Sequence, residues 1–459
     1  MRKNLHKILF VSTIVVLTLL MVQTYTGLVH VKPLAGVTVE TEKPKLTFKN
    51  YVDGTFQNDL EKYCREHCGF REWFIRLYNQ YRWSCFRETD NTTVVRGKDN
   101  WLFEEVYVRD HYESSMYEYT SDTAEMREIL ETEALRLWKV QELLKEHNIH
   151  IFVNITPSKD VIFPEYLPEN VSYTRPVGLR AYDYYKKRFD ELGIHYIDNV
   201  AIFKAIKDTV NYPLFYERGT HWSNIASVYV FDSILRYMEA LGGRQLPHLE
   251  IGEKYQAKPR DPDKDLENLL NLVFPMKSSP YWYVDVDVKE DSTQVKPFMT
   301  VIGDSYHWNF IFNIPLLKIF QKVPYWFYNS TIYEDDEHQN TSDLDFEKEL
   351  MRNDYIMLSY GSCSLYRLGS YFLPKALLYL CYDQSTIDTV ADGIIQYFKS
   401  DPKAYSVMLE KAKVQNKSVD KVMYDDAVYM ITMNPEQYFE ELRGNRLPVS
   451  RNKDLKRMK

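Results

Sequence analysis

Short apolar segments that alternate with long amphipathic segments constrain the fold of this chain more than any other sequence feature. The predicted strands lie at residues 150–155, 194–197, 298–302 and 355–358. The predicted helices lie at 123–147, 179–192 and 223–241. Helices between short buried strands predict an α/β fold, with a parallel sheet flanked by helices. Ligands on such sheets bind beyond the carboxyl ends of the strands, so residues that directly follow strands are the candidates for function.

The N-terminus predicts an exported protein. Arg2, Lys3 and Lys7 precede an uncharged segment at residues 8–29 that is mostly apolar. A helix of about 20 such residues can cross the hydrocarbon core of a membrane. Positive charge before the segment predicts a cytoplasmic N-terminus and an exported body. Because no small-x-small motif directly follows the apolar run, we expect an uncleaved single-pass anchor in the cell membrane rather than a removed signal peptide. Either way, the body lies in the periplasm or at the cell surface.

The rest of the chain divides into a large domain with attachments at both ends. The expected parts are an anchor (1–29), a spacer (30–50), a catalytic-type domain with a helical N-terminal part (51–383) and a helical C-terminal extension (384–459). Within the domain, residues 94–103 are expected to form two short strands around a turn. Residues 243–296 are expected to form an insertion or long loop, because they are rich in Pro, Asp and Lys.

Composition excludes some classes of function. The formal charge of −8 argues against broad nucleic-acid binding, which requires a basic surface. The five cysteines form no metal-binding motif, and no Gly-rich phosphate loop is visible. We therefore predict neither a metal nor another cofactor.

The first candidate site follows the predicted strand 298–302. There the chain continues as Gly303–Asp304–Ser305, which places a serine hydroxyl on a sharp turn at the carboxyl edge of the sheet. Backbone N–H groups at such a turn can stabilise an oxyanion. The alternative is structural, since Asp304 or Ser305 could simply cap a helix over residues 308–320.

The second candidate site is His221, in the run Gly219–Thr220–His221–Trp222 directly before the predicted helix 223–241. A histidine beside a serine can take the serine proton during attack on an acyl carbon and return it to the leaving group. For an isolated histidine, capping or packing would be the better interpretation. The pair favours chemistry, because Ser305 follows a predicted strand, His221 follows the short apolar run 214–216, and the two can meet at one edge of the sheet.

Four motifs in order give the chain a resemblance to a known family. They are GKDNWLF (97–103), Pro-Ser-Lys with the continuation Phe-Pro-x-Tyr-Leu-Pro (157–168), Thr-His-Trp (220–222) and Gly-Asp-Ser (303–305). The region from about Tyr51 to Leu380 resembles the SGNH-hydrolase-like domains of the alginate O-acetyltransferases AlgX and AlgJ and the wider DHHW-motif proteins. In that family, as here, the histidine motif precedes the serine motif.

The resemblance implies roles for individual residues. Ser305 would be the nucleophile and His221 the general base. The family places an aspartate two residues before the histidine to orient the imidazole, but here that position is Gly219. Glu217 or Asp304 could take over this role, or a backbone carbonyl could hold the ring.

Three further residues could bind substrate. Lys159 could bind an anionic sugar or lie on the surface. Trp222 and Tyr306 flank the proposed catalytic pair, and each could stack on a sugar ring or pack in the core.

The expected function is transfer of an acyl group to hydroxyls of an exported or cell-wall polysaccharide, with acetyl as the leading candidate for that group. The resemblance implies a multi-pass membrane acyltransferase as the partner that supplies the acyl group. Two alternatives stay open: a carbohydrate esterase that uses the same serine and histidine, and a non-catalytic polysaccharide-binding or assembly component. The substitution at Gly219 favours the last.

Overall fold

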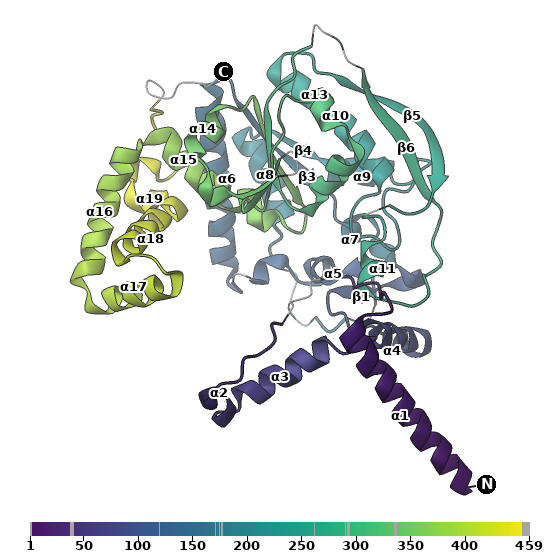
Figure 1. Ribbon diagram of the computed structural model, residues 1–459. Coiled ribbons are helices and arrows are strands. Elements are labelled where there is room, and N and C mark those ends of the chain that lie inside the picture. Colours follow the sequence, from purple (N-terminus) through teal and green to yellow (C-terminus); the bar gives the residue numbers. More distant parts are fainter. Residues whose placement is uncertain are drawn as a thin grey trace. The chain divides into compact units, whose positions relative to one another are not determined.

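The computed structural model describes residues 2–36, 41–118, 120–169, 171–173, 175, 178–260, 262–289, 291, 294–334 and 337–451 (Figure 1). The chain forms two compact units. The first unit consists of residues 1–105, 217–220 and 260–279. The second unit consists of residues 106–216, 221–259 and 280–459.

The first unit is mainly helical. Its elements are α1 (Arg2–Thr26), α2 (Phe48–Val52), α3 (Thr55–Glu66), α4 (Arg71–Phe86), β1 (Val94–Arg96), η1 (Lys98–Asn100), β2 (Leu102–Glu104) and α11 (Asp265–Leu269). Strands β1 and β2 pair antiparallel around the predicted turn, which confirms that expectation. The predicted spacer is tied to this unit, because Asn271 Oδ1 accepts a hydrogen bond from the N–H of Ala35 (2.8 Å).

The second unit is built on a seven-stranded sheet with the order β10-β9-β8-β7-β11-β3-β4. The strands are β3 (His150–Thr156), β4 (Tyr196–Asp198), β7 (Met299–Gly303), β8 (Tyr325–Phe327), β9 (Thr331–Glu334), β10 (Glu337–Asn340) and β11 (Tyr355–Gly361). Strands β8, β7, β11, β3 and β4 are parallel, and β9 and β10 extend one edge in antiparallel pairing. The four predicted strands all lie in the parallel part, as expected for an SGNH-like α/β fold.

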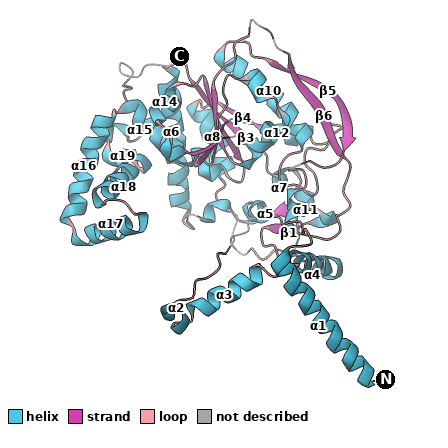
Figure 2. Ribbon diagram, in the orientation of Figure 1, coloured by secondary structure: helices cyan, strands magenta, loops and turns pink. Residues whose placement is uncertain are grey.

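Helices cover both faces of this sheet. Figure 2 shows α6 (Thr123–Lys145), α14 (Phe346–Met351) and α15 (Phe372–Cys381) on one side, with α10 (Asn224–Gly242) and α12 (Trp308–Asn313) on the other. The remaining elements before the C-terminal region are α5 (Glu105–Tyr112), η2 (Ser115–Glu118), α7 (Lys159–Ile162), η3 (Pro164–Tyr166), α8 (Ala181–Leu192), α9 (Asn199–Ile206), η4 (Ser305–His307), α13 (Leu316–Ile319), η5 (Thr341–Asp343) and η6 (Leu365–Tyr371). Strands β7 and β11 are buried along their whole length, as two-sided coverage requires.

The C-terminal helices share the core of the second unit. They are α16 (Gln384–Ser400), α17 (Pro402–Gln415), α18 (Val419–Met433) and α19 (Pro435–Tyr438), followed by η7 (Glu440–Leu442). Arg136 of α6 joins them through a bidentate ion pair with Glu436, at 2.7 and 2.8 Å. Lys139 of the same helix donates to the carbonyl of Leu442 (2.5 Å). This region therefore braces the second unit.

Two local predictions were wrong. The segment 243–296 was predicted to be an insertion or long loop, and the loop alternative is wrong for the part that forms the antiparallel ribbon of β5 (His248–Ala257) and β6 (Tyr281–Lys289). The signal was alternation, since Tyr281 and Tyr283 turn to one face and pack with Tyr216. The helix predicted over 308–320 is divided into α12 and α13 at Pro315, because a proline cannot continue the helical hydrogen bonds.

Candidate active site

The candidate serine stands on a sharp turn at the carboxyl end of β7. Gly303 ends the strand so close to β11 that a Cβ atom there would lie 2.2 Å from the carbonyl oxygen of Ser359. Only glycine fits this approach. The next residue, Asp304, donates its N–H to the same carbonyl (3.1 Å), and Ser305 begins the turn η4. The N–H of Ser305 has no acceptor within the described part of the chain, so it can donate to a ligand.

Asp304 fixes this turn. Its carboxylate accepts hydrogen bonds from the N–H of Tyr306 (3.2 Å), the N–H of Gly361 (2.6 Å) and the hydroxyl of Ser364 (2.9 Å). Burial raises the pKa of Asp304, while these hydrogen bonds and the nearby His221 act in the opposite direction. Among the described residues, the imidazole of His221 is not a hydrogen-bond partner of this carboxylate. Asp304 therefore holds the serine turn.

The candidate histidine is positioned by the start of α10. Ser223 caps this helix by accepting from the N–H of Ala226 (3.1 Å), and its own N–H donates to the carbonyl of Leu214 (2.8 Å). Trp222 is fully buried, and its carbonyl accepts from the side-chain amide of Asn309 (3.3 Å) in α12. Burial of the Trp222 side chain and the hydrogen bond to its carbonyl therefore hold the backbone next to His221 in place.

The side chains of Ser305 and His221 are in contact. Nε2 of His221 lies 2.8 Å from Oγ of Ser305, within hydrogen-bond distance. The ring of Tyr306 packs edge-on against the imidazole, with ring centroids 4.9 Å apart. Both Ser305 and His221 are partly exposed, so a ligand can reach them. A serine hydroxyl bonded to an imidazole nitrogen is the arrangement that nucleophilic acyl transfer requires.

A comparison with protein families matches part of the chain. The family model described as "SGNH hydrolase-like domain, acetyltransferase AlgX" matches residues 94–314, a range that contains both His221 and Ser305. This region is an SGNH-hydrolase-like domain similar to AlgX. A comparison of the sequence with curated proteins found no match.

Three solved structures are similar to part of this chain. The O-acetyltransferase domain of Pseudomonas putida AlgJ is 19% identical and aligns over 60% of this chain and 92% of its own, with a TM-score of 0.38. Pseudomonas aeruginosa AlgX is 13% identical, with coverages of 62% and 66% and a TM-score of 0.38. Bacillus cereus PatB1 is 11% identical, with coverages of 59% and 96% and a TM-score of 0.37.

Gly219 is the departure from the aspartate expected of an AlgX-type sequence. A Cβ atom on Gly219 would lie 2.7 Å from the carbonyl oxygen of Asp263 and 3.3 Å from that of Pro262. The segment 260–279 therefore occupies the space that a side chain would need. Glu217, in the same unit, accepts a hydrogen bond from the hydroxyl of Ser279.

The other candidate residues of this AlgX-like domain are buried. Lys159 has no exposed surface, and Trp222 and Tyr306 are 0% and 1% exposed. The two aromatic rings pack edge-on at 5.4 Å. Trp222 and Tyr306 therefore pack in the core, which was one of the two alternatives for each residue. Lys159 is buried as well and does not lie on the surface.

Sequence reasoning missed the part of the site that follows β11. Gly361 and Ser364 both donate to Asp304 and thereby fix the serine turn. The signal was available, since the run Gly361–Ser362–Cys363–Ser364 directly follows a predicted strand. A second missed residue is Tyr107, whose hydroxyl donates to that of Tyr306 (3.4 Å).

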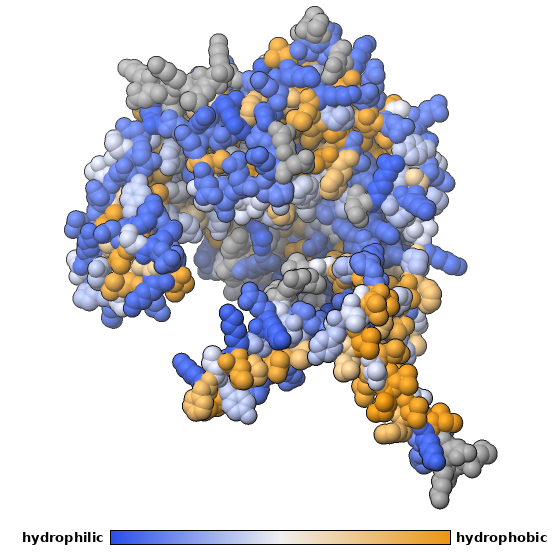
Figure 3. Space-filling model, in the orientation of Figure 1, coloured by the Kyte–Doolittle hydropathy of each residue, from blue (hydrophilic) through white to orange (hydrophobic). Residues whose placement is uncertain are grey.

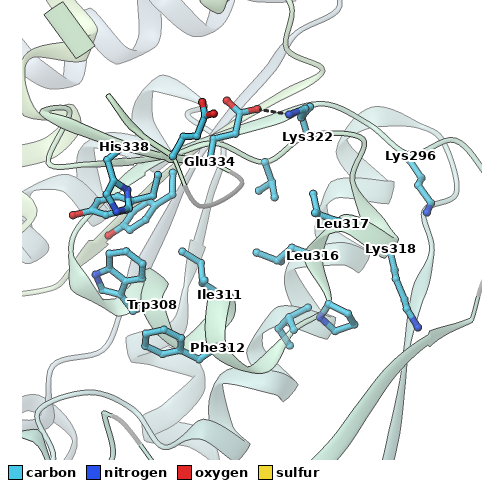
Figure 4. A pocket seen from close by; sticks show the side chains of 16 residues that line it. Lys296, Trp308, Ile311, Phe312, Leu316, Leu317, Lys318, Lys322, Glu334 and His338 are labelled. Atoms are coloured by element: carbon cyan, nitrogen blue, oxygen red, sulfur yellow. Dashed lines mark ion pairs between the residues drawn. The ribbon is translucent and has the colours of Figure 1, made fainter. Parts of the chain in front are cut away.

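A cavity of about 860 Å³ lies on the same unit but is not lined by the serine–histidine pair. Figure 4 shows its apolar floor, with Ile311, Phe312 and Leu316, and its lysines. Lys322 forms an ion pair with Glu334 (3.0 Å) there. Volume alone therefore does not identify the reactive position in this fold.

Proposed function

We propose that this protein transfers an acetyl group to hydroxyls of an exported polysaccharide through Ser305 and His221. The observation that carries the proposal is the 2.8 Å contact between Ser305 Oγ and His221 Nε2 inside the region that matches an acetyltransferase family. Serine and histidine at this distance can form and break an ester without any other reactive group.

The reaction has two symmetrical halves. In the first, Ser305 Oγ attacks the acyl carbon of the donor while its proton passes to His221 Nε2. The imidazolium then protonates the leaving group, and acetyl-Ser305 remains. In the second, His221 takes the proton of a sugar hydroxyl, the sugar oxygen attacks acetyl-Ser305, and the proton returns to Ser305 Oγ. The N–H of Ser305 supports the proposal, because it can donate to the oxyanion formed in each half.

Packing supports the position of His221. The ring of Tyr306 contacts the imidazole edge-on, and buried Trp222 anchors the backbone beside it.

We further infer that α1 is an uncleaved membrane anchor that holds the body outside the cytoplasm. Residues His6–Thr26 form one helix with a mean hydropathy of 2.1 that is long enough to cross a membrane, and none of this stretch is buried. The anchor would keep the exported body beside a multi-pass acyltransferase that supplies acetyl groups from the cytoplasmic side.

The test is the acetyl content of surface polysaccharide in cells that carry Ser305→Ala. Ser233→Ala, an exposed serine on α10, is the matched control. We expect loss of acetylation only with Ser305→Ala, at equal protein levels. Unchanged acetylation would refute the catalytic role and favour a polysaccharide-binding component. Increased acetylation would refute transfer and favour an esterase that uses the same residues.

A further inference from the structure

Helix α4 (Arg71–Phe86) exposes apolar residues where a surface helix normally exposes polar ones. Its exposed aromatic face consists of Trp73 (44% exposed), Phe74 (50%), Leu77 (53%), Tyr78 (49%) and Tyr81 (56%). These positions are spaced by one, three and four residues, so they form one continuous stripe along the helix. An exposed apolar stripe of this kind marks an interaction surface.

The opposite face of α4 already holds the helix in its unit. Trp83 is buried in a cluster with Val94, Leu102, Leu266 and Leu270. Asn79 on the same side donates its amide to the carbonyl of Leu270 (2.9 Å). The aromatic face is therefore not needed to build the core of the first unit.

The start of α4 is joined to the end of the apolar helix α1. Gly69, two residues before α4, donates its N–H to the hydroxyl of Thr24 (2.8 Å). A Cβ atom on Gly69 would lie 2.6 Å from the carbonyl oxygen of Leu20, so only glycine permits this close contact. From Leu20 to the end of α1 at Thr26 the helix rises about 9 Å.

The chain that leaves α1 is also fastened to α4. Arg76 donates a hydrogen bond to the carbonyl of Pro33 (2.7 Å). The first contact thus holds the start of α4 beside the last turns of α1, and the second ties α4 to the chain that follows α1. Figure 3 shows that hydrophobic residues cover most of α1 beyond its hydrophilic N-terminal end.

We propose that the aromatic face of α4 lies in the membrane–water interface and binds the lipid surface. This inference rests on the proposed role of α1 as an uncleaved anchor. Trp and Tyr are enriched at this interface, where amphipathic helices bury their apolar face about 5–10 Å deep. Because Gly69 contacts α1 between Leu20 and Thr24, about 3–9 Å before its end, α4 starts close to that depth. Because its contacts hold α4 beside α1, the lipid surface around α1 is the partner expected at this aromatic face.

The experiment uses the full chain in lipid nanodiscs that contain phospholipids brominated near the headgroup end of their acyl chains. Bromine quenches tryptophan fluorescence only at close range. We expect partial loss of emission for the wild-type protein and a smaller loss for Trp73→Phe. Trp101→Phe, a half-buried tryptophan of the same unit, serves as the matched control and should keep the wild-type loss. The double variant Leu77→Glu/Tyr81→Glu should also reduce the loss, since the charges draw the face out of the lipid.

Equal quenching in wild type and Trp73→Phe would overturn the proposal. The nanodisc contains no partner protein, so a face that binds another protein instead would stay unquenched. Extraction of the wild-type chain from cell membranes by alkaline carbonate would overturn the anchor, and with it this proposal. Neither result bears on acetyl transfer by Ser305, which the polysaccharide assay measures separately.

Discussion

Restoring the family aspartate by Gly219→Asp should destabilise the protein instead of completing a catalytic triad. A Cβ atom at this position would lie 2.7 Å from the carbonyl oxygen of Asp263, 3.0 Å from its carbonyl carbon and 3.3 Å from the carbonyl oxygen of Pro262. Contacts below 3.0 Å are essentially never seen for a real Cβ atom, and backbone atoms cannot move aside as a flexible side chain can.

The expected loss in the free energy of unfolding has two sources, overpacking and the added charge. Forcing one extra carbon into a filled site costs about 1–3 kcal/mol, which is the expected loss for Gly219→Ala. The aspartate adds a carboxylate near two carbonyl oxygens, and an unsatisfied buried polar group costs about another 1–3 kcal/mol. At about 1 °C per kcal/mol for a chain of 459 residues, Gly219→Ala should lower Tm by about 1–3 °C, and Gly219→Asp should lower it further.

Differential scanning calorimetry of the purified full chain measures these shifts. Gly393→Ala in α16 is the control, because nothing lies within 4 Å of the Cβ position there. It should be neutral or stabilising by up to about 1 kcal/mol, as alanine favours a helix. A Gly219→Asp protein with the Tm of the wild type and faster acylation of Ser305 would refute the reasoning, since it would show that position 219 accepts an orienting acid.

Two further predictions concern stability. Burial lowers the pKa of His307 to about 3, so the unfolded chain binds a proton near pH 6.5 and the folded chain does not. The free energy of unfolding should therefore fall by up to about 1.4 kcal/mol per pH unit between pH 6.5 and 3, and Tm should fall less steeply for His307→Phe; equal slopes would contradict this. Arg136→Met leaves the carboxylates of Glu133 and Glu436 unpaired and should cost about 3–5 kcal/mol in urea unfolding. Arg236→Met removes an exposed pair and should cost less than about 1 kcal/mol, so similar losses in both variants would be the contrary result.

The sequence predicts the parallel sheet well, because buried strands such as β7 and β11 are apolar along their length. Ser305 directly follows β7, whereas His221 follows no strand of this sheet in the described part of the chain and instead precedes α10. The two residues are 84 positions apart, and Oγ of Ser305 lies 2.8 Å from Nε2 of His221.

The sequence does not predict what depends on packing between distant segments. Nothing local to Gly219 shows that residues 262 and 263 fill the space beside it. Likewise, the roles of Gly361 and Ser364 as donors to Asp304 depend on the register of β11 against β7. The ribbon of β5 and β6 was missed because its polar composition resembles a loop, although its alternation is that of a strand.

Mass spectrometry of the purified protein after incubation with an activated acetyl ester tests the central claim most directly. Wild type and Ser305→Ala are compared at equal folded fractions. The account predicts a mass gain of one acetyl group in the wild type alone, located on Ser305 by peptide mapping. A folded wild-type protein that gains no acetyl group, even with the membrane acyltransferase present, or one that is acetylated equally in Ser305→Ala, would contradict the proposed chemistry.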